Sequence, residues 1–390
     1  MAVADGRLTS SALDALRPTR ATIDLTRLAA NYRAITAAAP VPIMPVLKAD
    51  AYGHGAIPVA RKLVELGATM LAVAYVEEAA ALRDAGITVP IVVMAGFTAA
   101  QLDVVERHAL VPVLGSASTV RLITSRPRGS AKLAVHLKVD TGMTRLGLGA
   151  DDAVAAAEAL VASASTDLAG ILTHLACADE NADVTRQQLD LFDEILARLS
   201  GRGIRPRFVH AANSAGLAFS RAGHTLARPG LLLYGVRPRP LSPAIEVQPV
   251  MTVTTAVAAL RDVAAGTSVS YGGRWTAARP SKIATLPVGY ADGVPRTHAM
   301  SEHGFVMVRG QRCPVAGNVC MDLMMADVTG VADAAESDRV VLMGDEPTAW
   351  DVADWAGTNA WDAMTRIGAR VPRVYVENDT ILSFDSKYRF

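Results

Sequence analysis

The feature that most limits the fold of this chain is a regular alternation of short apolar runs and longer amphipathic stretches over its first 235 residues. The eight apolar runs lie at 43–50, 69–75, 90–96, 110–115, 132–140, 168–176, 207–213 and 231–235. Stretches between them, such as 56–68 and 185–203, carry apolar residues three and four apart and end near glycine, which is typical of helices. Eight strand–helix units favour a closed parallel barrel over an open sheet.

The pattern changes after about residue 240. A proline-rich segment at 237–250 is expected to link two domains. Beyond it, β-type segments occur at 250–260, 282–289, 304–317 and 338–344, and helical patterns at 349–357 and 360–368. We therefore expect an α/β protein: an N-terminal (β/α)8 TIM-like barrel at residues 1–245 and a C-terminal mainly β domain at 246–390.

Charge and composition exclude several classes of protein. Lys and Arg together count 38, as do Asp and Glu, so the formal net charge is zero. This argues against nonspecific binding of nucleic acid or an anionic membrane. Three cysteines without CxxC spacing suit a reducing compartment, and the histidines show no metal-ligand spacing. Neither a signal-peptide pattern nor an apolar run of about 18 residues is seen, so we expect a cytoplasmic protein.

Polar residues collect where the apolar runs stop. In a (β/α)8 barrel the carboxyl ends of the strands form one face, which carries the active site. The residues expected at that face are Lys48, Lys138, Asp140, Arg145, His174, His210, Asn213, Ser214, Arg228 and Gly230. Taken singly, each has a structural interpretation: a snorkelling lysine, a core histidine, an ion-paired arginine or a side chain that braces a loop.

Lys48 raises the sharpest question, because lysine is almost never buried without a partner. An amine held among apolar neighbours has a lowered pKa and is able to attack an aldehyde. Pyridoxal 5′-phosphate is the obvious aldehyde. Its phosphate would need donors, and the Tyr52 and Ser214 hydroxyls and the backbone N–H groups around Gly230 are candidates, since phosphate sites in such barrels lie after strands 7 and 8.

Eight motifs in order resemble the alanine racemase family, over nearly the whole chain from Thr19 to the final strand. They are VLKADAYGHGA (46–56), LKVDTGMTRLG (137–147), HAANSAG (210–216), RPGLLLYG (228–235), VSYGGRW (269–275), LPVGYADGVPR (286–296), GNVCMD (317–322) and RIGARVPRVY (366–375). The resemblance implies a head-to-tail homodimer in which both chains build each active site, and a cofactor held covalently by Lys48.

The resemblance also implies roles for other residues. Arg228 would face the pyridine nitrogen without protonating it, because arginine keeps its proton in proteins. Arg145 would reach the phenolic oxygen of the cofactor, supported by Lys138, which is often carbamylated in this family. Apart from the resemblance, Asn213 is expected either to brace its loop or to contact the cofactor, and His210 to brace a loop near the site.

Racemisation removes a proton from one face of Cα and returns it to the other, so two bases are expected. By the resemblance these are Lys48 and Tyr271 of the partner subunit. A tyrosine hydroxyl has a reference pKa of about 10, so the pKa would have to fall by roughly 3 units for work near neutrality. A relay through His174 to the cation Arg228 could lower it. The Met321 N–H and Arg145 would hold the substrate carboxylate, and Tyr290 would narrow the entrance.

The chain departs from the family at Trp361, where a tyrosine that donates to the cofactor phosphate is usual. Indole also has one donor, its N–H, but the ring is larger than that of tyrosine and the N–H points in a different direction from a tyrosine hydroxyl.

The expected function is interconversion of L- and D-alanine, which supplies D-alanine for peptidoglycan. Alternatives are a racemase for serine or a broader amino-acid set, a barrel-type pyridoxal phosphate decarboxylase, and a non-catalytic cofactor-binding protein.

Overall fold

The computed structural model describes residues 16–127 and 129–386. These residues form two compact units. The barrel unit comprises residues 29–51 and 55–247, and the C-terminal unit comprises the described residues up to Leu28, Tyr52–His54 and those from Gln248 on. The division after residue 247 falls inside the proline-rich segment 237–250.

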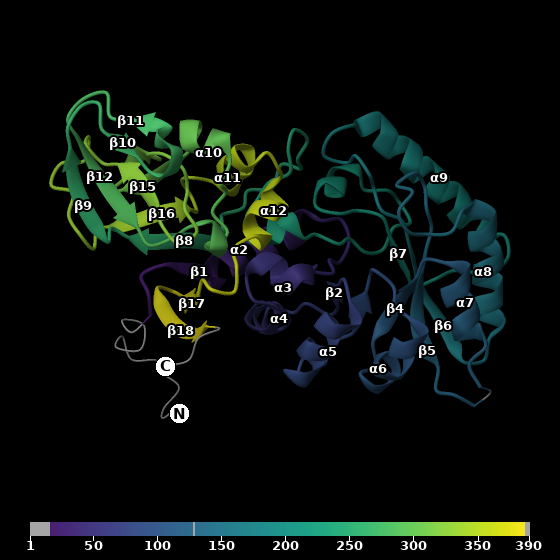
Figure 1. The fold of residues 1–390 in the computed structure, drawn as a ribbon. Helices are drawn as coiled ribbons and strands as arrows, with labels where there is room; N and C mark the ends of the chain where they lie inside the picture. Colours follow the sequence, from purple (N-terminus) through teal and green to yellow (C-terminus); the bar gives the residue numbers. More distant parts are fainter. Residues whose placement is uncertain (1–15, 128, 387–390) are drawn as a thin grey trace. The chain divides into compact units, whose positions relative to one another are not determined.

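A parallel sheet forms the core of the barrel unit (Figure 1). Its strands, in spatial order, are β2 (Leu71–Val73), β3 (Ile91–Val93), β4 (Val111–Leu114), β5 (Leu133–Lys138), β6 (Thr166–Leu172) and β7 (Phe208–His210). Val, Ile and Leu dominate these strands, and almost every residue is buried, as expected when both faces of a parallel sheet are covered. The register between β5 and β6 shifts at Val135 and His136.

Two further segments close this sheet into a barrel. Residues 43–47 bridge to β2 through Val46 and Ala72, and Ile43 bridges to Ala227. The segment around Ala227 in turn bonds to the chain beyond β7, where Arg228 N–H donates to the Ala212 carbonyl over 2.9 Å. The expected barrel is thus confirmed, and so is the strand-rich C-terminal unit described below.

The eighth strand lies elsewhere than the sequence predicts. Residues 231–235 were expected to form it, but this prediction is wrong: Leu231–Tyr234 form the 3₁₀ helix η3, and residues 226–229 fill the eighth position. A short apolar run that is buried on all sides has no periodicity that separates strand from helix. The first strand is also short, because Pro42 and Pro45 lack an N–H to donate to a ladder.

Helices cover the barrel strands on the outside, as Figure 1 shows for α5 to α9. Besides η3, the barrel unit contains the helices α4 (Ala56–Glu65), α5 (Val76–Asp84), η1 (Ala99–Gln101), α6 (Leu102–Arg107), α7 (Ala117–Thr124), α8 (Ala150–Ala162), α9 (Ala182–Ser200) and η2 (Ala215–Phe219). A side chain caps the longest of them: the Asn181 side-chain oxygen accepts from the N–H groups of Asp183 and Val184 at the start of α9. Helices α2 (Leu25–Ala38) and α3 (Lys48–Gly53) belong partly to each unit.

The C-terminal unit is built on strands, as the sequence predicts. A seven-stranded sheet has the order β14 (Gln311–Pro314), β13 (Phe305–Val308), β16 (Arg339–Met343), β8 (Met251–Ala256), β1 (Arg20–Asp24), β17 (Arg373–Glu377) and β18 (Thr380–Asp385). A three-stranded sheet has the order β15 (Met324–Asp327), β12 (Ser281–Leu286) and β9 (Ala259–Val263), and β10 (Ser268–Val269) pairs with β11 (Trp275–Thr276).

The position of β1 could not be seen in the sequence. This N-terminal strand lies between β8 and β17 in the C-terminal unit, although residues 1–245 were expected to form the barrel domain. Its partners are more than 220 residues away along the chain, so no local pattern reports the pairing.

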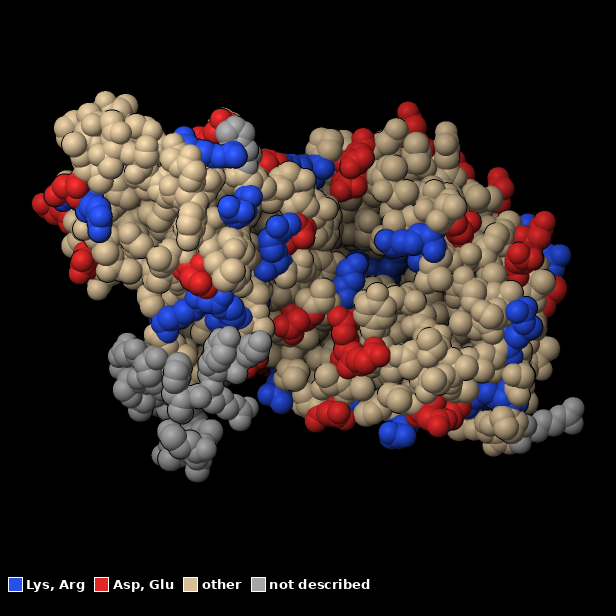
Figure 2. Space-filling model, in the orientation of Figure 1, with Lys and Arg blue, Asp and Glu red and all other residues tan. Residues whose placement is uncertain are grey.

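Short helices complete the C-terminal unit: η4 (Tyr271–Gly273), η5 (Tyr290–Asp292), α10 (His298–His303), α11 (Ala349–Ala356) and α12 (Ala360–Thr365). Within the described residues, no helix of either unit is long and apolar enough to cross a membrane. Acidic and basic side chains are interspersed over the face drawn in Figure 2, in keeping with their equal numbers.

Candidate active site

The carboxyl ends of the barrel strands bring together the charged residues that the sequence places there. Lys48 follows the first strand segment, Lys138 ends β5, His174 follows β6, His210 ends β7, and Arg228 lies on the eighth segment. Lys138, His210 and Arg228 are buried, and Lys48 and His174 are half-buried. A polar cluster inside a barrel mouth is the arrangement expected of an active site.

Lys48 is followed by a turn with an uncommon backbone. Ala49 to Tyr52 all have φ near +54°, and Gly53 has φ +80°, so α3 is a single left-handed turn. Each L-residue costs roughly 1–2 kcal/mol in this conformation. The turn is held by Ala49 N–H, which donates to the Glu78 carboxylate over 2.6 Å, and by Ala56 N–H, which donates to the Asp50 carboxylate over 2.7 Å. Backbone strain of this kind concentrates at functional sites.

Burial and neighbouring positive charges lower the basicity of the Lys48 amine. Burial lowers its pKa from the usual value, the charge of Arg145 lowers it further, Glu78 acts in the opposite direction, and Arg228 adds a smaller decrease. A larger fraction of the amine is therefore neutral near physiological pH than for a lysine in water. The neutral form is the nucleophile and the base.

Lys138 is subject to the same positive charges as Lys48. Burial, then the charges of Arg145 and Arg228, lowers the pKa of its amine to about 8. Asp140 opposes this shift, and its own pKa is lowered overall because the N–H groups of Gly142, Thr144 and Met143 outweigh the effect of partial burial. All three donate to its Oδ1 atom, over 2.9–3.1 Å. Asp140 offsets part of the positive charge of Lys138, so the charges of Arg145 and Arg228 leave the cluster with a surplus of positive charge.

Arg228 is fixed from several sides. Its Nη1 donates to the carbonyl and to Nδ1 of His210, both over 2.8 Å. Its Nη2 donates to the Thr173 and Ala211 carbonyls over 2.8 and 3.0 Å, and lies 3.5 Å from His174 Nδ1. Burial lowers the pKa of the guanidinium to about 10, so it remains a cation at neutrality. These contacts occupy the terminal N–H groups, while the Nε–H has no hydrogen bond to a described residue.

A third histidine, which the sequence patterns did not reveal, extends this network. His136 is buried in the middle of β5, and its Nδ1 lies 2.9 Å from His210 Nε2. Its ring fills the space above Gly170, where a Cβ would come within 2.7 Å of the imidazole. The signal available in the sequence was a histidine inside an otherwise apolar strand, LAVHLK at 133–138.

The loops after strands 7 and 8 are joined at Ser214. Its Oγ accepts from the N–H groups of Gly230 and Leu232, over 3.0 and 3.3 Å, so its own O–H remains as a donor. The Gly230 N–H, one of the backbone groups predicted to donate to a phosphate, donates to this oxygen. Asn213 braces its loop through Oδ1, which accepts from Gly216 N–H over 2.8 Å.

The other predicted site residues belong to the C-terminal unit. Tyr52 is buried, and burial raises the pKa of its hydroxyl, which stays protonated as a donor. Tyr271, Tyr290 and Met321 are exposed, with 70%, 40% and 53% of their surface accessible. Their segments are joined: Asn318 Nδ2 donates to the Tyr271 carbonyl over 2.7 Å, and Tyr290 N–H donates to the Cys320 carbonyl over 3.0 Å. We call these three exposed side chains on connected segments the Tyr271 face.

Trp361 also lies in the C-terminal unit, on α12. Its ring packs edge-on against Trp350, with centroids 5.8 Å apart and an interplanar angle of 87°. This edge-to-face packing holds the indole of Trp361 against a neighbouring aromatic ring.

The residues of the barrel unit fit pyridoxal phosphate. An amine with a lowered pKa, a serine hydroxyl left as a donor beside a glycine-containing loop, and a buried arginine with one N–H remaining match its aldehyde, phosphate and ring nitrogen. The surplus of cations suits the negative charges of a phosphate and of a substrate carboxylate. Within the described part of the chain, no group of three His, Cys, Asp or Glu residues is arranged to hold a metal ion.

Comparison with known proteins agrees with this chemistry. The family models "Alanine racemase, N-terminal domain" and "Alanine racemase, C-terminal domain" match residues 23–238 and 250–375. A curated alanine racemase of Sorangium cellulosum is 44% identical over 93% of this chain and 100% of its own length. One from Halothermothrix orenii is 42% identical over 92% of this chain and 97% of its own length.

Solved structures give the same result. An alanine racemase from Clostridium difficile matches with a TM-score of 0.89 at 31% identity, over 95% of this chain and 98% of that one. The alanine racemase of Streptomyces lavendulae, a producer of D-cycloserine, matches with a TM-score of 0.85 at 37% identity, over 92% and 97%. The chain therefore belongs to the alanine racemase family of amino-acid racemases.

Proposed function

We propose that this chain interconverts L-alanine and D-alanine with pyridoxal 5′-phosphate held by Lys48, in a homodimer whose active sites are shared between subunits. The observation that carries the proposal is the amine of Lys48, whose pKa is lowered by burial and by the charges of Arg145 and Arg228, at the mouth of a barrel of this family. When bound, the cofactor withdraws electrons from Cα of the substrate and makes its proton acidic.

The chain's own residues would hold the cofactor from several directions. Lys48 would bind the aldehyde, and the hydroxyls of Ser214 and Tyr52 would donate to the phosphate. The Nε–H of Arg228 would face the ring nitrogen, since its terminal N–H groups are held by His210, Thr173 and Ala211. Arg145 would reach the phenolic oxygen.

Two groups would exchange the proton at Cα. Lys48 would act on one face, and Tyr271 of the partner subunit on the other. His174 Nδ1 lies 3.5 Å from the Arg228 guanidinium, which only donates, so the proton of neutral His174 would sit on Nε2 and point toward the phenol oxygen. Burial lowers the pKa of His174, and the positive charges of Arg228, Lys138 and Arg145 lower it further. The same positive charges would favour a phenolate. Arg145 and the Met321 N–H would hold the carboxylate.

The exposure of the Tyr271 face supports the sharing of sites. Tyr271, Tyr290 and Met321 are substrate-facing in the proposal yet largely open in a single chain. Large exposed apolar side chains gathered on one surface are typical of an interface.

Exchange of the α-hydrogen with deuterated water, over a panel of L- and D-amino acids, tests the reaction. Wild type should exchange both enantiomers of alanine. Tyr271→Phe should lose exchange from one enantiomer more than from the other. If that variant exchanged both at the wild-type rate, the assignment of Tyr271 as a base would fail. Release of CO2 instead would indicate a decarboxylase.

Mixing two inactive variants tests whether sites are shared. Lys48→Ala and Tyr271→Ala proteins would each be inactive, but subunit exchange would create mixed dimers with one intact site. Random mixing should restore about a quarter of the wild-type activity, because half of the dimers are mixed and each has one intact site of two. No recovery, despite exchange shown by mass spectrometry, would place both bases in one chain.

A second candidate, a broader substrate range, is favoured only by Trp361. Its packing against Trp350 leaves a larger aromatic group where the family has tyrosine. The same substrate panel decides between the two, because a serine rate comparable to the alanine rate would favour the broader enzyme.

A further inference from the structure

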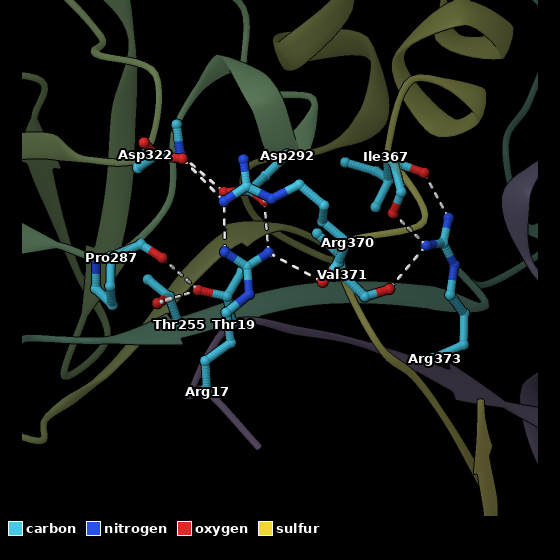
Figure 3. Close-up of polar contacts among 12 residues, drawn as sticks. Arg17, Thr19, Thr255, Pro287, Asp292, Asp322, Ile367, Arg370, Val371 and Arg373 are labelled. Atoms are coloured by element: carbon cyan, nitrogen blue, oxygen red, sulfur yellow. Dashed lines mark hydrogen bonds and ion pairs between the residues drawn. The ribbon is translucent and has the colours of Figure 1, made fainter. Parts of the chain in front are cut away.

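Four charged side chains of the C-terminal unit form a connected network, which we call the Asp292 network (Figure 3). Arg17 donates to both carboxylate oxygens of Asp292, over 3.1 and 2.5 Å. Arg370 places Nε 3.5 Å from Asp292 and donates from Nη2 to Asp322 over 2.8 Å. Arg17 also donates to the Arg370 carbonyl over 3.2 Å. The network therefore links segments that are far apart in the sequence.

Asp292 is the buried centre of this network. Only 1% of its side chain is accessible, whereas Arg17 and Arg370 are 28% and 34% accessible. Its Oδ2 also accepts from the Gly289 N–H over 3.1 Å. Bidentate arginine–carboxylate pairs fix geometry as well as charge, and a buried carboxylate that loses its partner is strongly destabilised.

The turn that Asp292 closes carries Tyr290 and lies directly against the Met321 segment. Tyr290 N–H donates to the Cys320 carbonyl over 3.0 Å, and Ala291 N–H donates to the Met321 carbonyl over 3.1 Å. A Cβ at Gly289 would lie 2.3 Å from both of those carbonyl oxygens. The two segments therefore move together, and Asp292 and Asp322 attach to one each.

Arg17 reaches this turn from an anchored segment. Thr19 Oγ1 donates to the Pro287 carbonyl over 2.8 Å, so the Thr255 hydroxyl, also 2.8 Å away, donates to Thr19. Two residues on, Ala21 N–H donates to the Pro372 carbonyl just before β17. Arg17 and Arg370 thus extend from fixed backbone toward the two loops.

We propose that Arg17 and Arg370 are positioning residues that act through Asp292 and Asp322 to set where the Tyr290 side chain and the Met321 N–H lie. By fixing these groups they determine which amino-acid side chains are accepted. The inference rests on the proposed function, in which Tyr290 limits the entrance and Met321 binds the substrate carboxylate. In this proposal both arginines act through the two carboxylates and not by contact with substrate or cofactor.

Hydrogen–deuterium exchange of the full-length protein tests the positioning directly. Arg17→Gln should raise the exchange rate of amides in 289–293 and 320–323 about tenfold, the change expected when one charge-assisted hydrogen bond is lost. Arg17→Lys should retain part of the protection, because lysine keeps the positive charge but lacks the two parallel N–H donors that bind both carboxylate oxygens. Arg309→Gln is the control: it breaks an exposed bidentate pair with Asp338 in the same unit and should leave these amides unchanged.

Substrate selectivity tests the consequence. Arg17→Gln and Arg370→Gln should raise kcat/KM for serine relative to alanine about fivefold, in the range that one pocket contact contributes. KM for alanine should rise more than kcat falls, and Arg309→Gln should change neither. Unchanged exchange rates would overturn the positioning role, and faster exchange with an unchanged ratio would overturn the role in selectivity. A wild-type protein without racemase activity would reject the proposed function, while the exchange rates would still decide the positioning.

Discussion

The Arg228 guanidinium donates to Nδ1 of His210 over 2.8 Å inside the barrel. Because arginine only donates, Nδ1 of His210 is an acceptor, and the proton of the neutral ring lies on Nε2. That proton is donated to His136 Nδ1, so His136 carries its own proton on Nε2. His136 Nε2 has no hydrogen-bond partner among the described residues. One buried cation therefore sets the tautomers of two histidines in turn.

These tautomers predict that substitutions of His210 and His136 will lower the free energy of unfolding by different amounts. His210→Leu would leave an Arg228 N–H unpaired in a buried site and should destabilise the protein by about 2–3 kcal/mol. His136→Leu should cost less, because it removes one unpaired N–H while leaving another on His210. Urea unfolding of both variants checks this, and a larger cost for His136→Leu would contradict the tautomer assignment.

The same histidines predict a pH dependence of stability. Burial and the charge of Arg228 lower the pKa of His136 to about 3 and that of His210 well below its usual value. In the unfolded chain both histidines bind a proton near pH 6.5, whereas in the folded chain they resist protonation. Their contribution to the free energy of unfolding is therefore complete above pH 6.5 and falls as the pH drops toward 3. The slope of the free energy of unfolding against pH should approach about 1.4 kcal/mol per pH unit for each histidine. His136→Leu should reduce the measured slope between pH 6 and 4, and an unreduced slope would contradict this.

Lys138 should react with carbon dioxide. Its pKa of about 8 leaves a useful fraction of neutral amine, and the charges of Arg145 and Arg228 would stabilise the carbamate anion that forms with release of a proton. Carbon-13 NMR with labelled bicarbonate should show a carbamate signal that grows from about pH 7 to about pH 8.5, as the neutral fraction of the amine rises. The signal should be absent in Lys138→Arg, and its persistence there would assign it to another amine.

The left-handed turn after Lys48 should be relieved by glycine. Ala49 is exposed and has φ +53°, so Ala49→Gly removes strain without leaving a cavity and should stabilise the protein by about 1 kcal/mol. Ala155 is exposed in the right-handed helix α8, where the same change should destabilise by about 1 kcal/mol. The midpoint of thermal unfolding should rise for Ala49→Gly and fall for Ala155→Gly. Shifts of the same sign would contradict the presence of strain at Ala49.

Trp361→Tyr should tighten cofactor retention, because a tyrosine hydroxyl at this position is expected to donate to the phosphate. The dissociation constant should fall about threefold to tenfold, as for one added hydrogen bond. Trp350→Tyr is the matched control, since it alters the ring contact at 5.8 Å without adding that donor. Equal dissociation constants for Trp361→Tyr and wild type would reject the idea.

Local periodicity was enough to predict the alternating strands and helices of the barrel, because each unit repeats within about thirty residues. It failed at Leu231–Tyr234, where burial on all sides hides the difference between a 3₁₀ helix and a strand. The left-handed turn at Ala49–Tyr52 was also beyond reach, since only Gly53 and Gly55 in that stretch indicate an uncommon backbone.

Residue types in their order along the chain were enough to establish the class of the protein, the lysine at the barrel mouth and the family. Folding in three dimensions was needed to show that β1 joins the C-terminal sheet, that His136 completes the support of Arg228, and that Arg17 closes the Tyr290 turn from 275 residues away. These contacts arise from packing and from burial of charge between segments that are distant in the sequence. Local periodicity does not report such contacts, because it depends only on neighbouring residues.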